Sequence, residues 1–171
     1  MNAAPLKSVI ESAFADVTLS GGVSLRQAEV MDNYGEGCSE EKFAALPLEE
    51  VTTDWRHIPR DELDRNPYLS YMDPPGFRYY IPAFMHSMID APTQYVDRWS
   101  ATLHSLCPKS GDLWDHSMMH YSALDLKQRS AIAAFLEWVS EDTRFRESNR
   151  KDAKEALATY WRLREGRGLE S

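Results

Sequence analysis

The chain has 171 residues and a formal net charge of −8, with 43% hydrophobic and 27% charged residues. These values are typical of a globular protein that can bury a core, and we expect one domain over residues 1–171. The negative charge disfavours nucleic acids and anionic membrane surfaces as partners, because both would repel it. A basic protein suits an acidic chain better, although many proteins are acidic only for solubility.

The two cysteines and the N-terminus predict the compartment. Cys38 and Cys107 are isolated in the sequence, so they form no disulfide framework and favour a reducing cytoplasm. The first residues lack a basic region followed by an apolar stretch, and no run approaches the roughly 18 apolar residues that a membrane span needs. We therefore expect a cytoplasmic protein that does not enter a membrane.

The first third of the chain predicts short helices. Apolar residues recur every three or four positions over residues 5–19, and Gly21-Gly22 ends that helix. Ser24 is a candidate N-cap, with Gln27 completing a capping box. Ser39 is expected to begin another short helix, and Asp54 to cap a turn.

The centre of the chain is harder to assign. The residues at 77–81 are expected to be extended, after which Pro82 would occupy the first position of a helix that runs to Asp90. Helical spacing resumes near Trp99, whereas 113–121 resembles a loop or a short strand.

Two longer helices are predicted at the C-terminal end. Ser122 is expected to cap the first, and the second is expected to run from about Asn149 to Glu165, with Gly166 as its C-cap. The sequence thus predicts a mostly α, single compact helical domain, and leaves open a small two-stranded element at 77–81 or 113–121.

One segment resembles a known family. Residues 71–85 read Y-M-D-P-P-G-F-R-Y-Y-I-P-A-F-M, which is similar to the F-L-D-x-x-G-F-x-F-Y-L-P-A-Y-M signature of a bacterial domain-of-unknown-function family. The identical positions are Asp73, Gly76, Phe77, Tyr80, Pro82, Ala83 and Met85. Weaker similarity extends over residues 8–140. The resemblance implies a shared fold, and it implies no particular activity.

Asp73 is the first candidate for chemistry. Its carboxylate would lie at the mouth of an aromatic pocket formed by Tyr71, Phe77, Tyr79 and Tyr80, where desolvation can shift proton affinity. The favoured alternative is structural, because an Asp in an Asp-Pro-Pro-Gly turn commonly accepts hydrogen bonds from the amides of that turn. Gly76 is expected to need a backbone conformation that is closed to β-branched residues.

Three further residues carry weaker signals. Arg78 lies among aromatics, where it would stack on a ring, bind an anion or form an ion pair. His116 and His120 have the i, i+4 spacing of a metal-binding pair, but the stretch lacks the Glu of a His-Glu-x-x-His motif. No metal or cofactor is therefore expected.

A loop-like stretch provides the best candidate for binding a protein. Trp114 lies between Asp112 and Asp115, and an aromatic flanked by acids suits a basic partner.

Two classes of function follow from these residues. The favoured one is an acidic protein-binding module, such as an immunity protein or small regulator that neutralises a basic partner, for example a toxin. The alternative is a small hydrolase-like enzyme or ligand sensor that uses the Asp73/aromatic pocket. Clustering of the acidic loops at 36–41, 49–50 and 112–115 would favour binding. Convergence of Asp73, Arg78 and a histidine in a cleft would favour the enzyme.

Overall fold

A computed structural model of the protein describes residues 3–33, 37–46, 54–92, 97–108 and 111–162. Within these ranges the chain forms helices joined by loops and contains no β-strand, which confirms the predicted compact helical domain. The possible two-stranded element at 77–81 or 113–121 is not observed, because both segments are helical.

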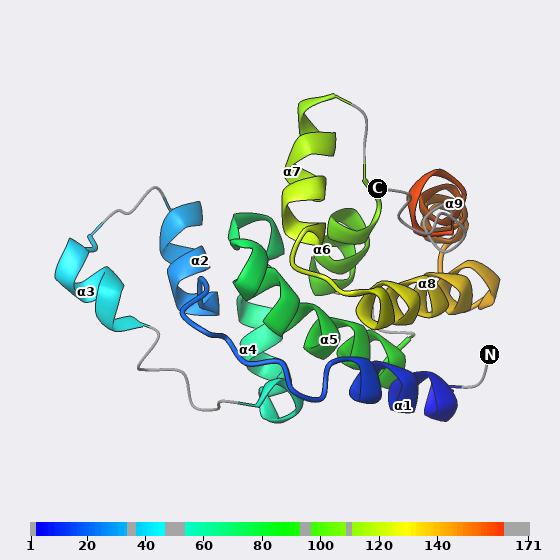
Figure 1. The fold of residues 1–171 in the computed structure, drawn as a ribbon, viewed down its shortest axis with the longest axis horizontal. Coiled ribbons are helices and arrows are strands. Elements are labelled where there is room, and N and C mark those ends of the chain that lie inside the picture. The colour runs from blue at the N-terminus through cyan, green and yellow to red at the C-terminus, as the bar shows by residue number, and fades with distance from the viewer. Residues whose placement is uncertain (1–2, 34–36, 47–53, 93–96, 109–110, 163–171) are drawn as a thin grey trace.

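Figure 1 shows how the helices follow one another along the chain. In chain order they are α1 (Ala3–Ala13), α2 (Leu25–Asp32), α3 (Glu40–Ala45), η2 (Trp55–His57), α4 (Arg60–Arg65), η3 (Leu69–Tyr71), α5 (Pro74–Asp90), α6 (Asp97–Leu106), α7 (Asp112–Tyr121), α8 (Leu126–Glu141), α9 (Glu147–Ala156) and η4 (Leu157–Trp161). The last of these, η4, is a π-helical turn that continues α9.

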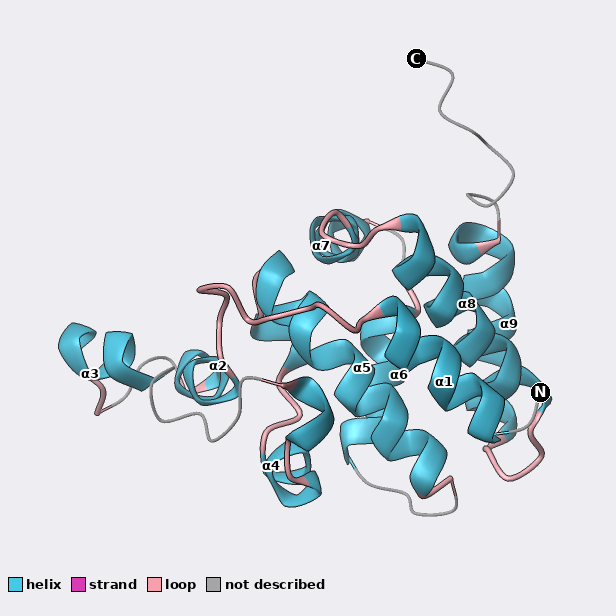
Figure 2. Ribbon diagram, turned by 60° about the horizontal axis from the view of Figure 1, so that its bottom comes forward, coloured by secondary structure: helices cyan, strands magenta, loops and turns pink. Residues whose placement is uncertain are grey.

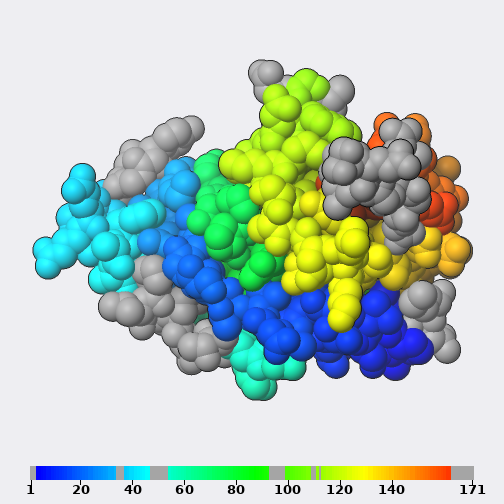
Figure 3. Space-filling model, in the orientation of Figure 1, coloured from blue at the N-terminus to red at the C-terminus, as the bar shows by residue number. Residues whose placement is uncertain are grey.

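The central helix is α5. Twelve of its 17 residues are buried, so it is apolar around most of its circumference, as expected for a helix enclosed by others. It contacts α1, α4, α6, α7 and η2. The helices α8 and α9 pack against each other and α1 packs along α8, whereas α3 has no buried residue and stands away from the body at one end of the molecule (Figures 2 and 3).

The start of α5 corrects the sequence prediction. The helix begins at Pro74 instead of Pro82, and 77–81 is helical instead of extended. Asp73 is its N-cap, and two prolines occupy the first positions, where their missing N–H groups cost nothing. Pro82 lies inside the helix, an arrangement that costs about 3 kcal/mol locally. The apolar burial around Pro82 offsets that cost, and local sequence reasoning could not include it.

Several predicted helix starts are confirmed. Ser24 and Gln27 form the expected capping box, with the Ser24 hydroxyl accepting from the Gln27 amide. Ser39 caps α3, and Asp54 caps η2. These short polar motifs act within one turn of the chain, so their chemistry is readable from sequence alone.

Other boundaries are corrected. The stretch 113–121 forms α7, and the cap of α8 is Asp125, in a capping box with Gln128, instead of Ser122. Helix α1 ends at Ala13, short of the predicted 5–19. The predicted C-terminal helix divides into α9 and η4, and Gly166 lies outside the described residues.

Two glycines bring separate chain segments into contact. Asp73 Oδ1 accepts hydrogen bonds from the backbone N–H of Gly76 at 3.0 Å and of Val23 at 2.8 Å. A Cβ on Gly22 would lie 2.5 Å from the Gly76 nitrogen, and a Cβ on Gly76 would lie 2.5 Å from the Val23 carbonyl oxygen. The absence of a side chain at Gly76 thus allows the two backbones to approach each other closely. The expectation that the backbone conformation of Gly76 itself requires glycine is wrong, because its φ is not positive.

This junction predicts the effect of adding one methyl group. Gly76→Ala should lower the free energy of unfolding by about 2 kcal/mol or more, because backbone atoms of both segments must move apart. Gly21→Ala is the control: its φ is +80° and its Cβ would meet nothing within 4 Å, so only the local penalty of about 1 kcal/mol applies. Urea unfolding of both variants tests this, and equal losses would contradict the close-approach account.

Candidate functional site

Three of the four rings of the predicted aromatic pocket are part of the core. Phe77, Tyr79 and Tyr80 each expose at most 1% of their surface, whereas Tyr71 is 39% exposed. Asp73 is half-buried and caps α5, which confirms the structural interpretation of its turn. The buried rings of Phe77, Tyr79 and Tyr80 therefore pack around α5 in the core and do not line an open ligand pocket.

Arg78 connects α5 to the loop between α7 and α8. Its Nη1 donates to the carbonyl oxygen of Ala123 at 3.4 Å, and its half-buried side chain lies over the end of α7. No ring stacking or ion pair is observed for Arg78 among the described residues, and anion binding stays a prediction. Within the described residues, the contact observed for its guanidinium is structural.

The histidine pair lies on one face of α7, as its spacing predicted. His116 Nε2 is 3.0 Å from the carbonyl oxygen of Ser70, and His120 Nε2 is 2.7 Å from that of Met72. Both imidazoles thus bind backbone. Within the described ranges, no group of three or more His, Cys, Asp or Glu residues has the arrangement of a metal site.

The acidic loops do not gather as one surface where they are described. Glu40 and Glu41 lie in α3 at one end of the molecule, whereas Asp115 is exposed on α7 (Figures 1 and 2). Residues 36 and 49–50, and the side chain of Asp112, lie outside the described part. The binding prediction must therefore be judged from what surrounds Trp114.

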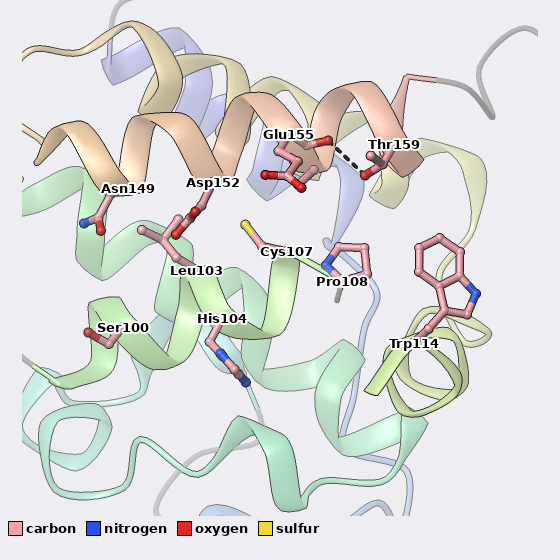
Figure 4. Close-up of a pocket in the computed structure, with 11 residues that line it drawn as sticks. Ser100, Leu103, His104, Cys107, Pro108, Trp114, Asn149, Asp152, Glu155 and Thr159 are labelled. Atoms are coloured by element: carbon pink, nitrogen blue, oxygen red, sulfur yellow. Dashed lines mark hydrogen bonds between the residues drawn. The ribbon is translucent and has the colours of Figure 1, made fainter. Parts of the chain in front are cut away.

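Trp114 lines a groove that the sequence did not reveal. The groove has a volume of about 610 Å³ and lies between α6, the start of α7 and α9 (Figure 4). Polar and apolar side chains both line it: Ser100, Leu103, His104, Cys107, Pro108, Trp114, Asn149, Asp152, Glu155, Ala156 and Thr159.

Two carboxylates give the groove its charge. Asp152 and Glu155 are exposed and lie three residues apart on α9, so they occupy neighbouring positions on one helical face. No lysine or arginine is among the lining residues, and none is paired with either carboxylate in the described structure. The groove therefore presents negative charge to whatever enters it.

Trp114 is held in place by other aromatic rings. Its ring packs edge-on against Tyr160 at 6.0 Å, and Tyr160 in turn contacts Tyr121 and Trp161. Trp114 is only half-buried, so part of its indole remains available in the groove. A fixed, partly exposed indole that lines the same groove as two carboxylates can accept a cation on its face.

A helical irregularity borders the same groove. The turn η4 is π-helical, and Thr159 within it lines the groove beside Ala156, the last residue of α9. Single π-helical turns are rare and occur frequently at functional sites. In this case the turn carries Tyr160 and Trp161, the two rings that support the aromatic cluster behind Trp114.

The groove also contains a thiol. The sulfur of Cys107, which directly follows α6, points towards α9, whereas the His104 imidazole on α6 points in the opposite direction (Figure 4). A cysteine nucleophile needs a base within hydrogen-bond reach, and this arrangement does not place His104 in that role.

Sequence reasoning found Trp114 and missed its neighbours. Asp152 and Glu155 alternate with the buried Ala153 and Ala156, a pattern that resembles the solvent-facing side of any amphipathic helix. The i, i+3 acid pair was the available signal, but only the packing of α9 beside α6 and α7 makes it part of a site.

The fold and site define an all-helical domain with an acidic, aromatic-lined groove. Residues 2–165 match a family described as "Family of unknown function (DUF6714)", and the protein belongs to that family. No curated protein and no solved structure matches the chain. None of the described helices is long and apolar enough to cross a membrane.

The role of Asp73 can be tested by two substitutions. Asp73→Ala removes the acceptor of two backbone N–H groups and should cost about 2 kcal/mol of unfolding free energy, in the upper range for the loss of a helix cap. Asp73→Asn keeps an acceptor oxygen and should cost less than half as much. Urea unfolding measures both; a loss as large for Asn as for Ala would show that the charge itself is required.

Proposed function

We propose that the protein is a binding module that captures a basic partner protein through the groove between α6, α7 and α9. The observation that carries this proposal is the combination of Asp152 and Glu155 with a fixed, partly exposed Trp114 in one groove of about 610 Å³. Carboxylates attract the charge of an arginine or lysine side chain, and the indole receives its apolar stem or its cationic head.

The net charge of the chain supports the same choice of partner. At −8, the protein attracts a basic surface over a distance of about one Debye length, which accelerates encounter and disfavours acidic competitors. Proteins that neutralise basic toxins, such as immunity proteins, or that regulate basic factors use this principle. Neither Cys38 nor Cys107 is in a disulfide, which is consistent with the cytoplasm as the place of action.

The alternative of a hydrolase-like enzyme or a ligand sensor has less support. It depended on Asp73 facing an aromatic pocket, and the Asp73 carboxylate instead accepts two backbone N–H groups beside buried rings. Asp73 and His120 are near each other, but each is engaged by backbone atoms in the packed interior. No observation favours this second function over binding.

Affinity capture from the source organism tests the proposal. The bait is wild type beside the double variant Asp152→Asn/Glu155→Gln, which removes both charges from the groove and keeps the side-chain shapes. Glu40→Gln/Glu41→Gln is the matched control, because it removes the same charge from α3. A basic protein retained by wild type and control, and lost by the groove variant, is the expected result. Equal retention by all three would place binding elsewhere.

Binding kinetics with the captured partner separate the contribution of the two carboxylates from that of Trp114. Neutralising the groove carboxylates should slow association by about tenfold at low salt and have little effect at high salt, because screening removes steering. Trp114→Ala should act mainly on dissociation, with a loss of about 2 kcal/mol, as expected for a central aromatic contact. Biolayer interferometry at two salt concentrations measures both rates. Unchanged rates in both variants would exclude the groove as the docking site.

A further inference from the structure

The helix that carries Trp114 is fastened to the body by two histidines. His116 lies 3.0 Å from the Ser70 carbonyl oxygen and His120 lies 2.7 Å from that of Met72, so both rings contact the turn that precedes α5. Each carbonyl can only accept, and therefore each Nε2 must carry its proton and donate. In a neutral imidazole this leaves Nδ1 without a proton.

The two rings are also in contact with each other. Their centroids are 4.4 Å apart in an edge-to-face arrangement, a favourable contact when at most one ring is charged. A proton on Nδ1 of both rings would place two positive charges at this separation. Like charges at such a distance repel strongly when one of them is removed from water.

Of the two histidines, His120 is buried and His116 is exposed. The His120 side chain is 2% exposed and stacks on Phe77 with centroids 4.9 Å apart and planes 13° from parallel. Burial lowers the pKa of His120 below its ordinary value of 6.5; the positive charge of His116 lowers it further, while the hydrogen bond to Met72 and the charge of Asp73 oppose the shift. A second proton on the pair is therefore unfavourable while α7 stays docked.

The surrounding charges compensate only in part. Asp73 faces His120 from α5, but its carboxylate already accepts the two N–H groups of Val23 and Gly76. Arg78, also on α5, adds a cation beside the end of α7 at Ala123. On α7 itself, Asp115 is exposed next to His116, where water screens it.

We propose that His116 and His120 form an acid-sensitive clamp, in which a second proton on the pair releases α7 from the 70–72 turn and displaces Trp114. For partner capture, and resting on the function proposed above, this clamp would open the groove and weaken binding in acid. The clamp itself is a property of the free protein and can be tested without a partner.

The direction of the pH dependence follows from linkage. A histidine whose pKa is depressed in the docked state stabilises that state above its ordinary value of 6.5, and the contribution is lost as the pH falls below it. His86 has a pKa lowered by burial as well, so it contributes in the same direction. The pH dependence of the free energy of unfolding therefore combines the effects of both histidines. A measurement specific to the clamp needs a probe on α7.

Fluorine NMR of the protein labelled with 5-fluorotryptophan supplies that probe. Five resonances arise from the five tryptophans, and Trp114→Phe assigns the one on α7. From about pH 7.5 to about pH 5, the Trp114 resonance of wild type should move with a midpoint below 6.5, the ordinary histidine value. His120→Gln, whose amide can still donate to Met72 but cannot titrate, should abolish this movement. His57→Gln is the control, because the His57 side chain is 75% exposed and lies outside α7.

Two results would overturn the clamp. One is a Trp114 resonance that does not move in wild type over this range; the other is the same movement in His120→Gln as in wild type. Should His120→Gln fail to fold, His116→Gln decides the question, because it removes one of the two charges. It should reduce the movement by about half or more. An unchanged movement in that variant contradicts the proposal.

Discussion

The contact between Gly22 and Gly76 is the constraint on which the rest of the structure depends. With no Cβ on either residue, the turn after α1 reaches the first turn of α5, where Asp73 Oδ1 accepts N–H groups from both segments. One carboxylate thereby caps the central helix and fixes the chain that leads into α2. In the Asp-Pro-Pro-Gly turn of this chain, Asp73 thus supplies the acceptor and Gly76 supplies the space.

From that point the packing extends to the groove. Phe77, one turn into α5, stacks on His120 of α7, and His120 also binds the Met72 carbonyl just before the cap. Helix α7 carries Trp114, which packs on Tyr160 at the π-helical end of α9. The groove is thus built on helices that are tied to the core. Under the proposed binding function, such a framework would hold the docking surface in one conformation before a partner arrives.

Sequence reasoning succeeded where the physics is local. The caps at Ser24 and Ser39 and the hydrogen bond from the Gly76 N–H to Asp73 depend on atoms within one turn of chain, and each was predicted correctly. The second bond to Asp73, from Val23, joins residues 50 positions apart and was not predicted. Sequence reasoning failed where burial decides. Pro82 was read as a helix start, but it lies within α5 because the residues around it are buried on every side. The groove could not be predicted from the sequence, because it combines Trp114 with Asp152 and Glu155, which lie about 40 positions away in the chain.

The central claim is that the acidic groove is where the partner docks, and a hydrogen-exchange footprint of the complex tests it most directly. Amide exchange measured by mass spectrometry, with and without the captured basic protein, should slow in peptides that cover the end of α6 with the adjoining Cys107, and in peptides from α9 that carry Glu155. Protection confined to the α1–α8 face or to α3, with α6 and α9 exchanging as in the free protein, would contradict the account.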